Sequence, residues 1–200
     1  MNYSGISECD VLNGTGFRVV LFVSGCSHKC YNCQNPKTWN ENFGHPFTDK
    51  TKEYLFGCLS KDYIDGITLT GGDPLYEQNL GNVLSLIKEI RISYPEKNIW
   101  LYTGYKLFID YPKSHKQHKT IVSTLPNAST NPIYDNELYL KKKEEDKKRS
   151  EIISLCDVVV DGEYIDKQRN LSKKWAGSDN QKVIDIEKSL AQNKIVLYCD

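Results

Sequence analysis

The segment FRVVLFVSGCSHKCYNC, residues 17–33, decides the fold because a buried strand and a cysteine-rich loop meet in it. Residues 17–23 are almost all apolar and rich in β-branched side chains, which predicts a strand covered on both faces, as in a parallel sheet. A Ser-Gly pair ends this run, and three cysteines follow: Cys26, Cys30 and Cys33. The cysteines are therefore expected at the carboxyl end of a central strand, where α/β sheets place their chemistry.

The rest of the chain repeats the order of strand and helix. Further strands are predicted at 66–70, 99–102 and 156–160, and each ends at a turn that contains glycine. Helices are predicted from the capping residue Thr48 to about residue 60 and over 80–91, where apolar residues recur with helical spacing. The buried face of the first helix is expected to hold Tyr54, Leu55, Cys58 and Leu59. This order predicts an α/β fold with a mostly parallel sheet and several loops on one edge.

Residues 113–150 interrupt that order. They are polar and rich in Pro, Asn, Ser and Thr, and they end in the charged run KKKEEDKKRS. We interpret them as an insert within one domain that spans residues 1–200, a length sufficient for a single core. The first part of the insert is expected to be a loop, and its end the exposed start of a helix that continues through 151–155.

Composition excludes several classes of partner. Twenty-six basic residues balance twenty-six acidic ones, so the net charge gives no attraction to nucleic acid or to an anionic membrane. No apolar run reaches the roughly 18 residues that a membrane span needs. The N-terminal residues lack the basic and apolar stretches of a signal peptide, so a reducing cytoplasm is expected.

The three-cysteine loop has several chemical interpretations. Zinc would need a fourth ligand, which His28 or His45 could supply. A redox pair of Cys30 and Cys33 would leave Cys26 without a role. An iron–sulfur cluster explains the number three, because a [4Fe–4S] cubane bound by three thiolates leaves one iron open to a substrate. The spacing therefore favours a cluster, with zinc as the next alternative.

At this point the residues resemble a known family. The spacing C-x3-C-x2-C is the signature of the radical S-adenosylmethionine (SAM) enzymes. The segments NGTGFRVVLFVSGCSHKCYNCQNPKTWN, ITLTGGDPLYEQN, IWLYTGYK, VVVDGEY and WAGSDNQ are similar, in this order, to the activating proteins of anaerobic ribonucleoside-triphosphate reductase, especially those of phages and enterobacteria. The resemblance covers about residues 1–112 and 151–182 and leaves the insert out.

The resemblance implies an activity and a fold. Cys26, Cys30 and Cys33 would bind a [4Fe–4S] cluster, and SAM would bind the fourth iron. Reductive cleavage of SAM would give a 5′-deoxyadenosyl radical, which generates a glycyl radical on the reductase, the protein substrate. A flavodoxin or ferredoxin would supply the electron. At this length the implied fold is a partial (β/α) barrel of radical SAM type with a laterally open sheet.

The resemblance also implies SAM contacts. They are expected from Asn32 and Gln34, which flank Cys33, and from the turn formed by Gly71, Gly72 and Asp73. No side chain is predicted to be catalytic, because the cofactors carry the chemistry.

Three further expectations concern the surroundings of SAM. Related enzymes have an aromatic or large apolar residue where this chain has Asn32, so Tyr31 is a candidate to pack on adenine. Arg18 could meet the SAM carboxylate, although a surface position is equally compatible with its place in the sequence. The family usually has Arg in place of Ala176, so Lys173 or Lys174 would have to supply a cation there.

Two kinds of alternative remain. One keeps the chemistry and changes the substrate: an activating enzyme for another glycyl-radical enzyme, such as pyruvate formate-lyase, or a small synthase acting on a pterin-like molecule. The other is a non-catalytic zinc or iron–sulfur module that docks on a partner. The flanking motifs argue against the first, and the identity of the bound metal would separate the second.

Overall fold

The computed structural model describes residues 1–107 and 136–199. The strands are β1 (Asn2–Asp10), β2 (Arg18–Val23), β3 (His45–Pro46), β4 (Gly66–Gly71), β5 (Asn98–Tyr102), β6 (Val158–Asp161) and β7 (Lys182–Asp185). The helices are α1 (Asp49–Leu59), α2 (Leu80–Ser93), α3 (Asn136–Ser154) and α4 (Ile186–Gln192), with short 3-10 helices η1 (Pro36–Trp39) and η2 (Asp166–Gln168).

All seven strands form one sheet in the order β3-β1-β2-β4-β5-β6-β7. The central strands β2, β4, β5 and β6 are parallel, whereas β1, β3 and β7 pair antiparallel at the two edges. The prediction of an α/β fold with a mostly parallel, laterally open sheet is confirmed. Closure into a barrel is not observed, since no pairing among the described strands joins β3 to β7.

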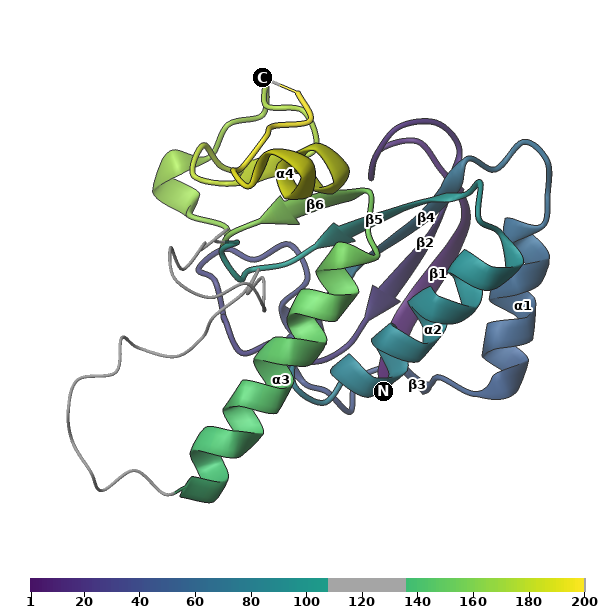
Figure 1. Cartoon of the computed structure of the whole chain (residues 1–200), viewed down its shortest axis with the longest axis horizontal. Helices are drawn as coiled ribbons and strands as arrows, with labels where there is room; N and C mark the ends of the chain where they lie inside the picture. The colour runs from purple at the N-terminus through teal and green to yellow at the C-terminus, as the bar shows by residue number, and fades with distance from the viewer. Residues whose placement is uncertain (108–135, 200) are drawn as a thin grey trace.

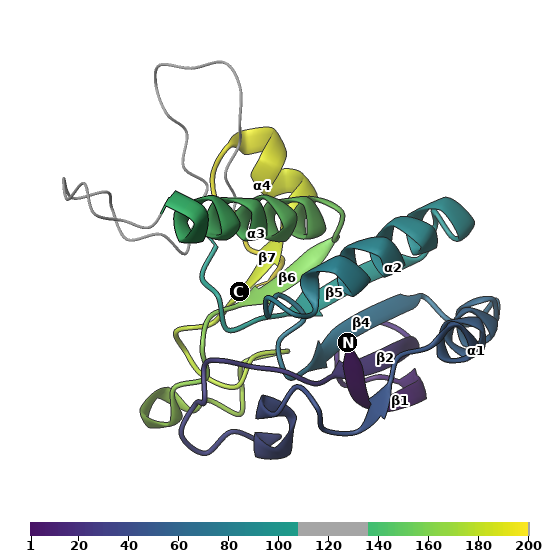
Figure 2. The ribbon, with the colours of Figure 1, turned by 90° about the horizontal axis from the view of Figure 1, so that it is seen from below.

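The two faces of the sheet have different coverings (Figures 1 and 2). Helices α1, α2 and α3 lie against one face, where Leu55, Ile87 and Ile152 pack on strand residues such as Leu21 and Leu69 in a single apolar core. The opposite face has a smaller apolar cluster around Trp100. It also carries the loop that follows β2, which Figure 2 shows on the side away from the helices. One face thus stabilises the fold, and the other is left for a site.

Most predicted elements are confirmed within two residues. Thr48 caps α1 as expected, through a capping box with Thr51. Strand β6 begins at Val158, two residues later than predicted, and Cys156 lies buried just before it. The prediction for Tyr54 was wrong: its side chain is 49% exposed and donates a hydrogen bond to Glu8 on β1.

The predicted insert divides into two parts. Its end forms α3, which continues the expected helix through the charged run. Its first part, with the predicted loop, falls in residues 108–135, outside the described residues. Arg149 on α3 is buried and donates its Nε hydrogen to the carbonyl of Leu75 at 3.0 Å, so this helix contacts the turn that follows β4.

Arg18 is the clearest departure from the sequence-based expectation. Its side chain is fully buried, neither on the surface nor free to meet a ligand. Its guanidinium donates to five acceptors at the amino ends of the central strands and in the preceding loop: Thr68 Oγ1, Asn98 Oδ1 and the carbonyls of Thr15, Ile67 and Asn98. Burial lowers the pKa of Arg18 to about 10. This arginine therefore stabilises the fold at the amino ends of the central strands.

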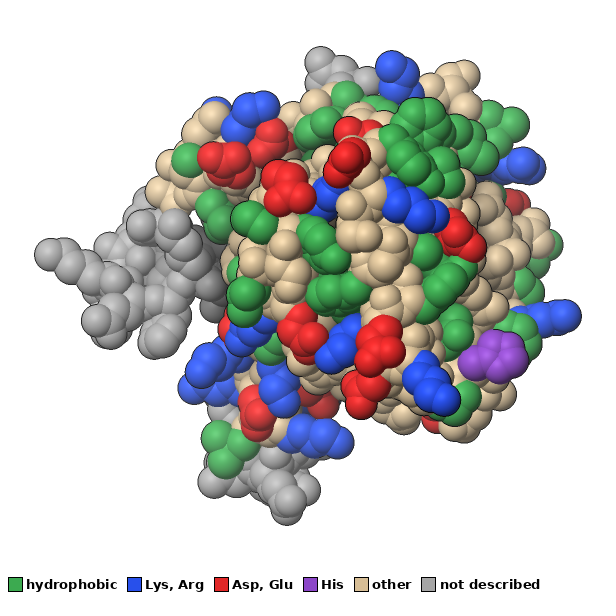
Figure 3. Space-filling view, turned by 90° about the vertical axis from the view of Figure 1, so that its right-hand side faces the viewer, with side chains coloured by type: hydrophobic (Ala, Val, Ile, Leu, Met, Phe, Trp, Pro, Cys, Tyr) green, Lys and Arg blue, Asp and Glu red, His purple; other side chains and the backbone are tan. Residues whose placement is uncertain are grey.

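Figure 3 shows basic and acidic side chains interspersed on the face seen from the α1 side. None of the helices in the described part of the chain is long and apolar enough to cross a membrane.

Candidate functional site

The cysteine loop begins at the carboxyl end of β2 and is held by backbone hydrogen bonds. The amide of Gly25 donates to the carbonyl of Thr38 at 2.8 Å, and the amide of Cys26 to that of Trp39 at 3.2 Å. Lys29 and Asn32 have left-handed backbone conformations, with φ values of 50° and 56°. These two residues turn the backbone sharply between successive cysteines of the loop.

The Gly-Gly-Asp turn after β4 is bonded directly to this loop. The amide of Gly72 donates to the carbonyl of Val23 at 2.7 Å, and the amide of Asp73 to that of Gly25 at 2.8 Å. A Cβ atom on Gly72 would lie 2.6 Å from the Gly25 carbonyl oxygen, closer than any real contact. Only glycine therefore permits the two loops to approach this closely.

A cavity of about 520 Å³ opens between these loops on the face without helices. All three loop cysteines line it, together with Gly71, Gly72 and Asp73. Aromatic side chains form much of the remaining wall: Phe22, Trp39, Tyr102, Tyr164 and Trp175. Its size is in the usual range for a small-molecule site.

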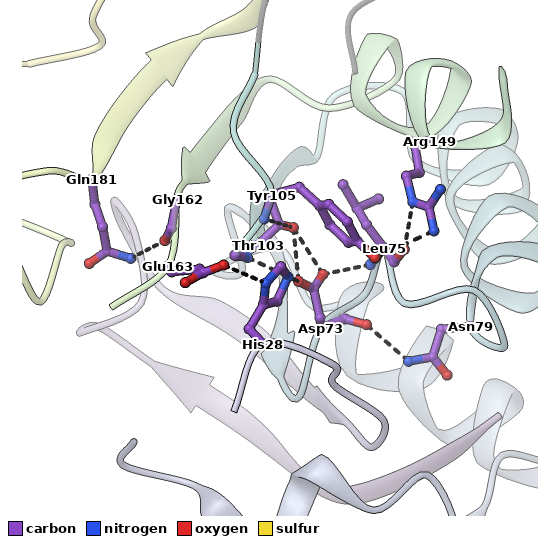
Figure 4. A network of polar contacts seen from close by, with 11 residues as sticks. His28, Asp73, Leu75, Asn79, Thr103, Tyr105, Arg149, Gly162, Glu163 and Gln181 are labelled. Carbon is purple, nitrogen blue, oxygen red and sulfur yellow. Dashed lines mark hydrogen bonds and ion pairs between the residues drawn. The ribbon is translucent and has the colours of Figure 1, made fainter. Parts of the chain in front are cut away.

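Asp73 is the centre of a hydrogen-bond network in the wall of this cavity (Figure 4). Its carboxylate is almost fully buried and accepts hydrogen bonds from the Thr103 hydroxyl at 2.9 and 3.0 Å. The amides of Leu75 and Gly104 also donate to it, at 2.8 and 2.9 Å. The carboxylate is thus engaged by protein donors, so the parts of this turn left for a ligand are backbone atoms of the two glycines.

His28 lies between the first two cysteines and contacts two carboxylates. Its Nε2 is 2.9 Å from Asp73 Oδ2, and its Nδ1 is 3.2 Å from Glu163 Oε1. The ring packs edge-on against Tyr105 with centroids 4.8 Å apart. Burial lowers the pKa of His28, but the hydrogen bonds and charges of Asp73 and Glu163 outweigh this effect, and the net pKa is raised.

The donor set fits an iron–sulfur cluster. All seven cysteines are free, and three of them line one cavity. Burial raises the pKa of the Cys26 thiol to about 11 and also raises that of Cys30, so in the metal-free protein these thiols keep their protons until a metal displaces them. Among the side chains that the structure describes, no three His, Cys, Asp or Glu groups converge on one point as ligands of a single ion. A cubane needs less convergence, because each thiolate binds a different iron.

The other residues predicted for the site fall in different places. Gln34 lines the cavity, whereas Asn32 and Tyr31 are exposed and do not contribute to its wall. Ala176 does line it. Lys173 donates to the carbonyls of Asp179 and Gln181 at 2.8 and 2.6 Å, so its ammonium group stabilises a neighbouring loop.

Two residues that contact each other here had no such role in the sequence-based prediction. The sequence indicates His28 only as a possible zinc ligand, and Glu163 only as a member of the segment VVVDGEY. They are 135 positions apart in the chain, so no local pattern connects them. The one available signal was that both follow the carboxyl ends of predicted strands, which meet at one edge of a parallel sheet.

Comparison with known proteins gives a consistent result. Residues 12–184 match the sequence model of a family described as a 4Fe-4S single cluster domain. A protein of Enterobacteria phage T4, named anaerobic ribonucleoside-triphosphate reductase-activating protein, is 41% identical over 183 residues, which are 92% of this chain and 93% of the phage protein.

Bacterial proteins with the same name are also similar. The one from Escherichia coli strain K12 is 34% identical over 185 residues, covering 92% of this chain and 97% of its own length. The one from Vibrio cholerae serotype O1 is 33% identical over 183 residues, covering 90% and 96%. Matches of this extent include part of residues 113–150, which the motif resemblance leaves out.

Proposed function

This chain belongs to the family of anaerobic ribonucleoside-triphosphate reductase-activating proteins, and we propose that it activates such a reductase by generating a glycyl radical on it. In this proposal the chain is an iron–sulfur oxidoreductase of the radical SAM type. Its cofactors are a [4Fe–4S] cluster and SAM. Its free thiols are in the state that a reducing compartment maintains, so we assign the reaction to the cytoplasm.

Cys26, Cys30 and Cys33 are the proposed cluster ligands. The observation that carries the proposal is that their three free thiols line the same cavity as the Gly-Gly-Asp turn. When bound, the reduced cluster supplies one electron that breaks a carbon–sulfur bond of SAM, giving methionine and a 5′-deoxyadenosyl radical that removes a hydrogen atom from a glycine of the reductase.

The charges of the cavity favour a cationic ligand such as SAM. The described residues that line it include two carboxylates, on Asp73 and Glu163, one histidine, His28, which contacts both, and no lysine or arginine. The lining is therefore net negative whether or not His28 carries a proton. SAM carries a sulfonium and an ammonium group against one carboxylate. The backbone carbonyls of Gly71 and Gly72 are suited to accept hydrogen bonds from that ammonium, because neither glycine has a side chain to cover them.

Aromatic residues are available for the adenine of SAM, and the open sheet is suited to a protein substrate. Tyr164 and Trp175 are candidates to pack on adenine in place of the exposed Tyr31. A laterally open sheet leaves room for a segment of a protein substrate, which a closed barrel would exclude. The electron would come from a flavodoxin or ferredoxin, because a low-potential cluster needs a low-potential reductant. Plant-type ferredoxin clusters have reduction potentials of about −400 mV.

The test is to form the radical on the partner. The chain is reconstituted with iron and sulfide without oxygen, then mixed with SAM, a reductant and an anaerobic ribonucleotide reductase. We expect a glycyl-radical signal by electron paramagnetic resonance (EPR), and none with the Cys30→Ser variant. A glycyl-radical signal on pyruvate formate-lyase but not on the reductase would show that the protein substrate is the alternative enzyme. Absence of any signal, with SAM left intact, would contradict the proposal.

A further inference from the structure

His28 connects three separate segments around the cavity. It belongs to the cysteine loop, and its two ring nitrogens reach Asp73 in the turn after β4 and Glu163 after β6 (Figure 4). The side chain of His28 is only 11% exposed, and that of Asp73 only 2%. Both ring nitrogens are therefore in contact with carboxylates of the protein.

The backbones of these two loops are already joined at the start of the cysteine loop. The amides of Gly72 and Asp73 donate to the carbonyls of Val23 and Gly25, at 2.7 and 2.8 Å. His28 adds a side-chain connection three residues later, between the first and second cysteines. Asp73 is itself fixed by Thr103 and Gly104 at the end of β5. Connections at two separate places fix both the distance and the orientation of one loop against the other, whereas the backbone bonds at the start of the loop alone would leave a hinge.

The surroundings of the ring leave little freedom for it to move. Gly104 packs so closely that a Cβ atom there would lie 2.4 Å from His28 Cδ2. Tyr105 packs against the ring, and Arg149 from α3 lies 4.8 Å from the Tyr105 ring centroid. The ring is thus packed between the segment after β5 and two carboxylates.

We propose that His28 is a positioning residue, which holds the thiol-bearing loop against the Gly-Gly-Asp turn and the segment after β6 and thereby sets the spacing between cluster and SAM. This inference rests on the proposed function. It assigns His28 to neither the cluster ligands nor the reacting groups. Its expected effect is on how SAM binds a cluster that has already formed.

Two conservative variants separate the two contacts. The amide nitrogen of Gln lies three bonds from Cβ, as Nε2 of histidine does, so His28→Gln can still donate to Asp73. The amide nitrogen of Asn lies two bonds from Cβ, as Nδ1 does, so His28→Asn can donate only to Glu163. His28→Phe keeps the ring and removes both contacts. Gly104→Ala keeps His28 and forces its ring to move, and Gly57→Ala, whose Cβ would meet nothing within 4 Å, is the matched control.

The contact is first checked in the metal-free protein. The Gly104 amide donates to the same Asp73 oxygen that His28 contacts, so its nuclear magnetic resonance shift reports on that oxygen. We expect this resonance to move in His28→Phe and His28→Asn and to stay close to the parent value in His28→Gln. Unchanged resonances in all three variants would show that the contact does not exist in solution.

The role is then measured on reconstituted protein through the dissociation constant of SAM and the EPR spectrum of the reduced cluster. We expect full iron content in every variant. SAM affinity should fall about tenfold or more in His28→Phe, His28→Asn and Gly104→Ala, the loss expected from one charge-assisted hydrogen bond. His28→Gln should stay within about threefold of the parent protein, and Gly57→Ala should match it.

Two other outcomes would overturn the inference. Iron content and melting temperature could fall in His28→Phe while SAM affinity per cluster stays unchanged, which would make His28 a structural residue only. All variants could also bind SAM as the parent does. A parent protein whose cluster does not respond to SAM would instead refute the proposed function, so the two failures are distinguishable.

Discussion

Two buried polar networks occupy opposite ends of the same parallel strands, and they differ in what surrounds them. At the amino ends, Arg18 is fully buried and donates only to neutral acceptors of the protein. At the carboxyl ends, His28 and Asp73 are equally well bonded but form the wall of a cavity, and their third partner, Glu163, is half exposed. A buried polar network therefore stabilises a fold where it is closed and organises a site where it borders a cavity.

The largest effect is expected at the carboxyl ends. Cys30→Ser removes one proposed cluster ligand, so we expect loss of the cluster and of reductase activation. Because this side chain borders a cavity, the free energy of unfolding of the metal-free protein should change by less than about 1 kcal/mol. Iron analysis and urea unfolding measure the two quantities. A large loss of stability in the metal-free variant would show that the carboxyl ends of the strands also stabilise the fold, which contradicts the comparison.

The second effect belongs to the amino ends. Arg18→Met leaves several buried acceptors without a donor, so the free energy of unfolding should fall by roughly 2–4 kcal/mol. Urea unfolding of the metal-free protein measures it. Iron content and SAM affinity per folded molecule should remain those of the parent. An Arg18→Met variant that is stable but fails to bind SAM would show that Arg18 contributes to SAM binding and not to stability.

A third, smaller effect concerns the contact between the loops. Gly72→Ala places a methyl group 2.6 Å from the Gly25 carbonyl oxygen. The two loops must then separate, because that oxygen belongs to the backbone and cannot turn away as a flexible side chain could. We expect SAM affinity to fall by about tenfold, while the free energy of unfolding falls by only about 1–2 kcal/mol. Equilibrium binding of SAM to the reconstituted protein checks this. Parent-like affinity would show that the spacing of the two loops is less critical than the His28 inference requires.

The smallest effect is expected far from both networks. Tyr54→Phe removes the exposed hydrogen bond to Glu8, and water replaces it at little cost. The midpoint of urea unfolding and the SAM affinity should both stay at parent values. A clear shift of the midpoint would mean that the edge between α1 and β1 contributes more to stability than its exposure indicates.

Much of the fold was predictable because the central strands are buried on both faces. The apolar run that becomes β2 and the capping residue Thr48 are strong local signals, and both are confirmed. The antiparallel edges were not predicted. Strand β1 has only partly buried or exposed residues, and β7 has only four residues, so neither has a long apolar pattern. Their pairing depends on neighbours that are distant in sequence.

The site was predictable only in part for a similar reason. Three cysteines in one short loop are a local signal, and the structure brings them to one cavity with the Gly-Gly-Asp turn. The contacts of His28 depend on segments 45 and 135 residues away, which sequence spacing does not reveal. Arg18 was misjudged because a charged residue at the start of a strand is usually exposed, whereas here loops and strand ends supply every acceptor.

The most direct test of the central claim is an EPR spectrum of the reduced, reconstituted protein with and without SAM. If the three thiols hold a [4Fe–4S] cluster with one iron open to the cavity, the signal will change shape when SAM is added, and 5′-deoxyadenosine will form. Stoichiometric zinc after purification, or a cluster whose spectrum is the same with and without SAM, would contradict the assignment of this cavity to SAM chemistry.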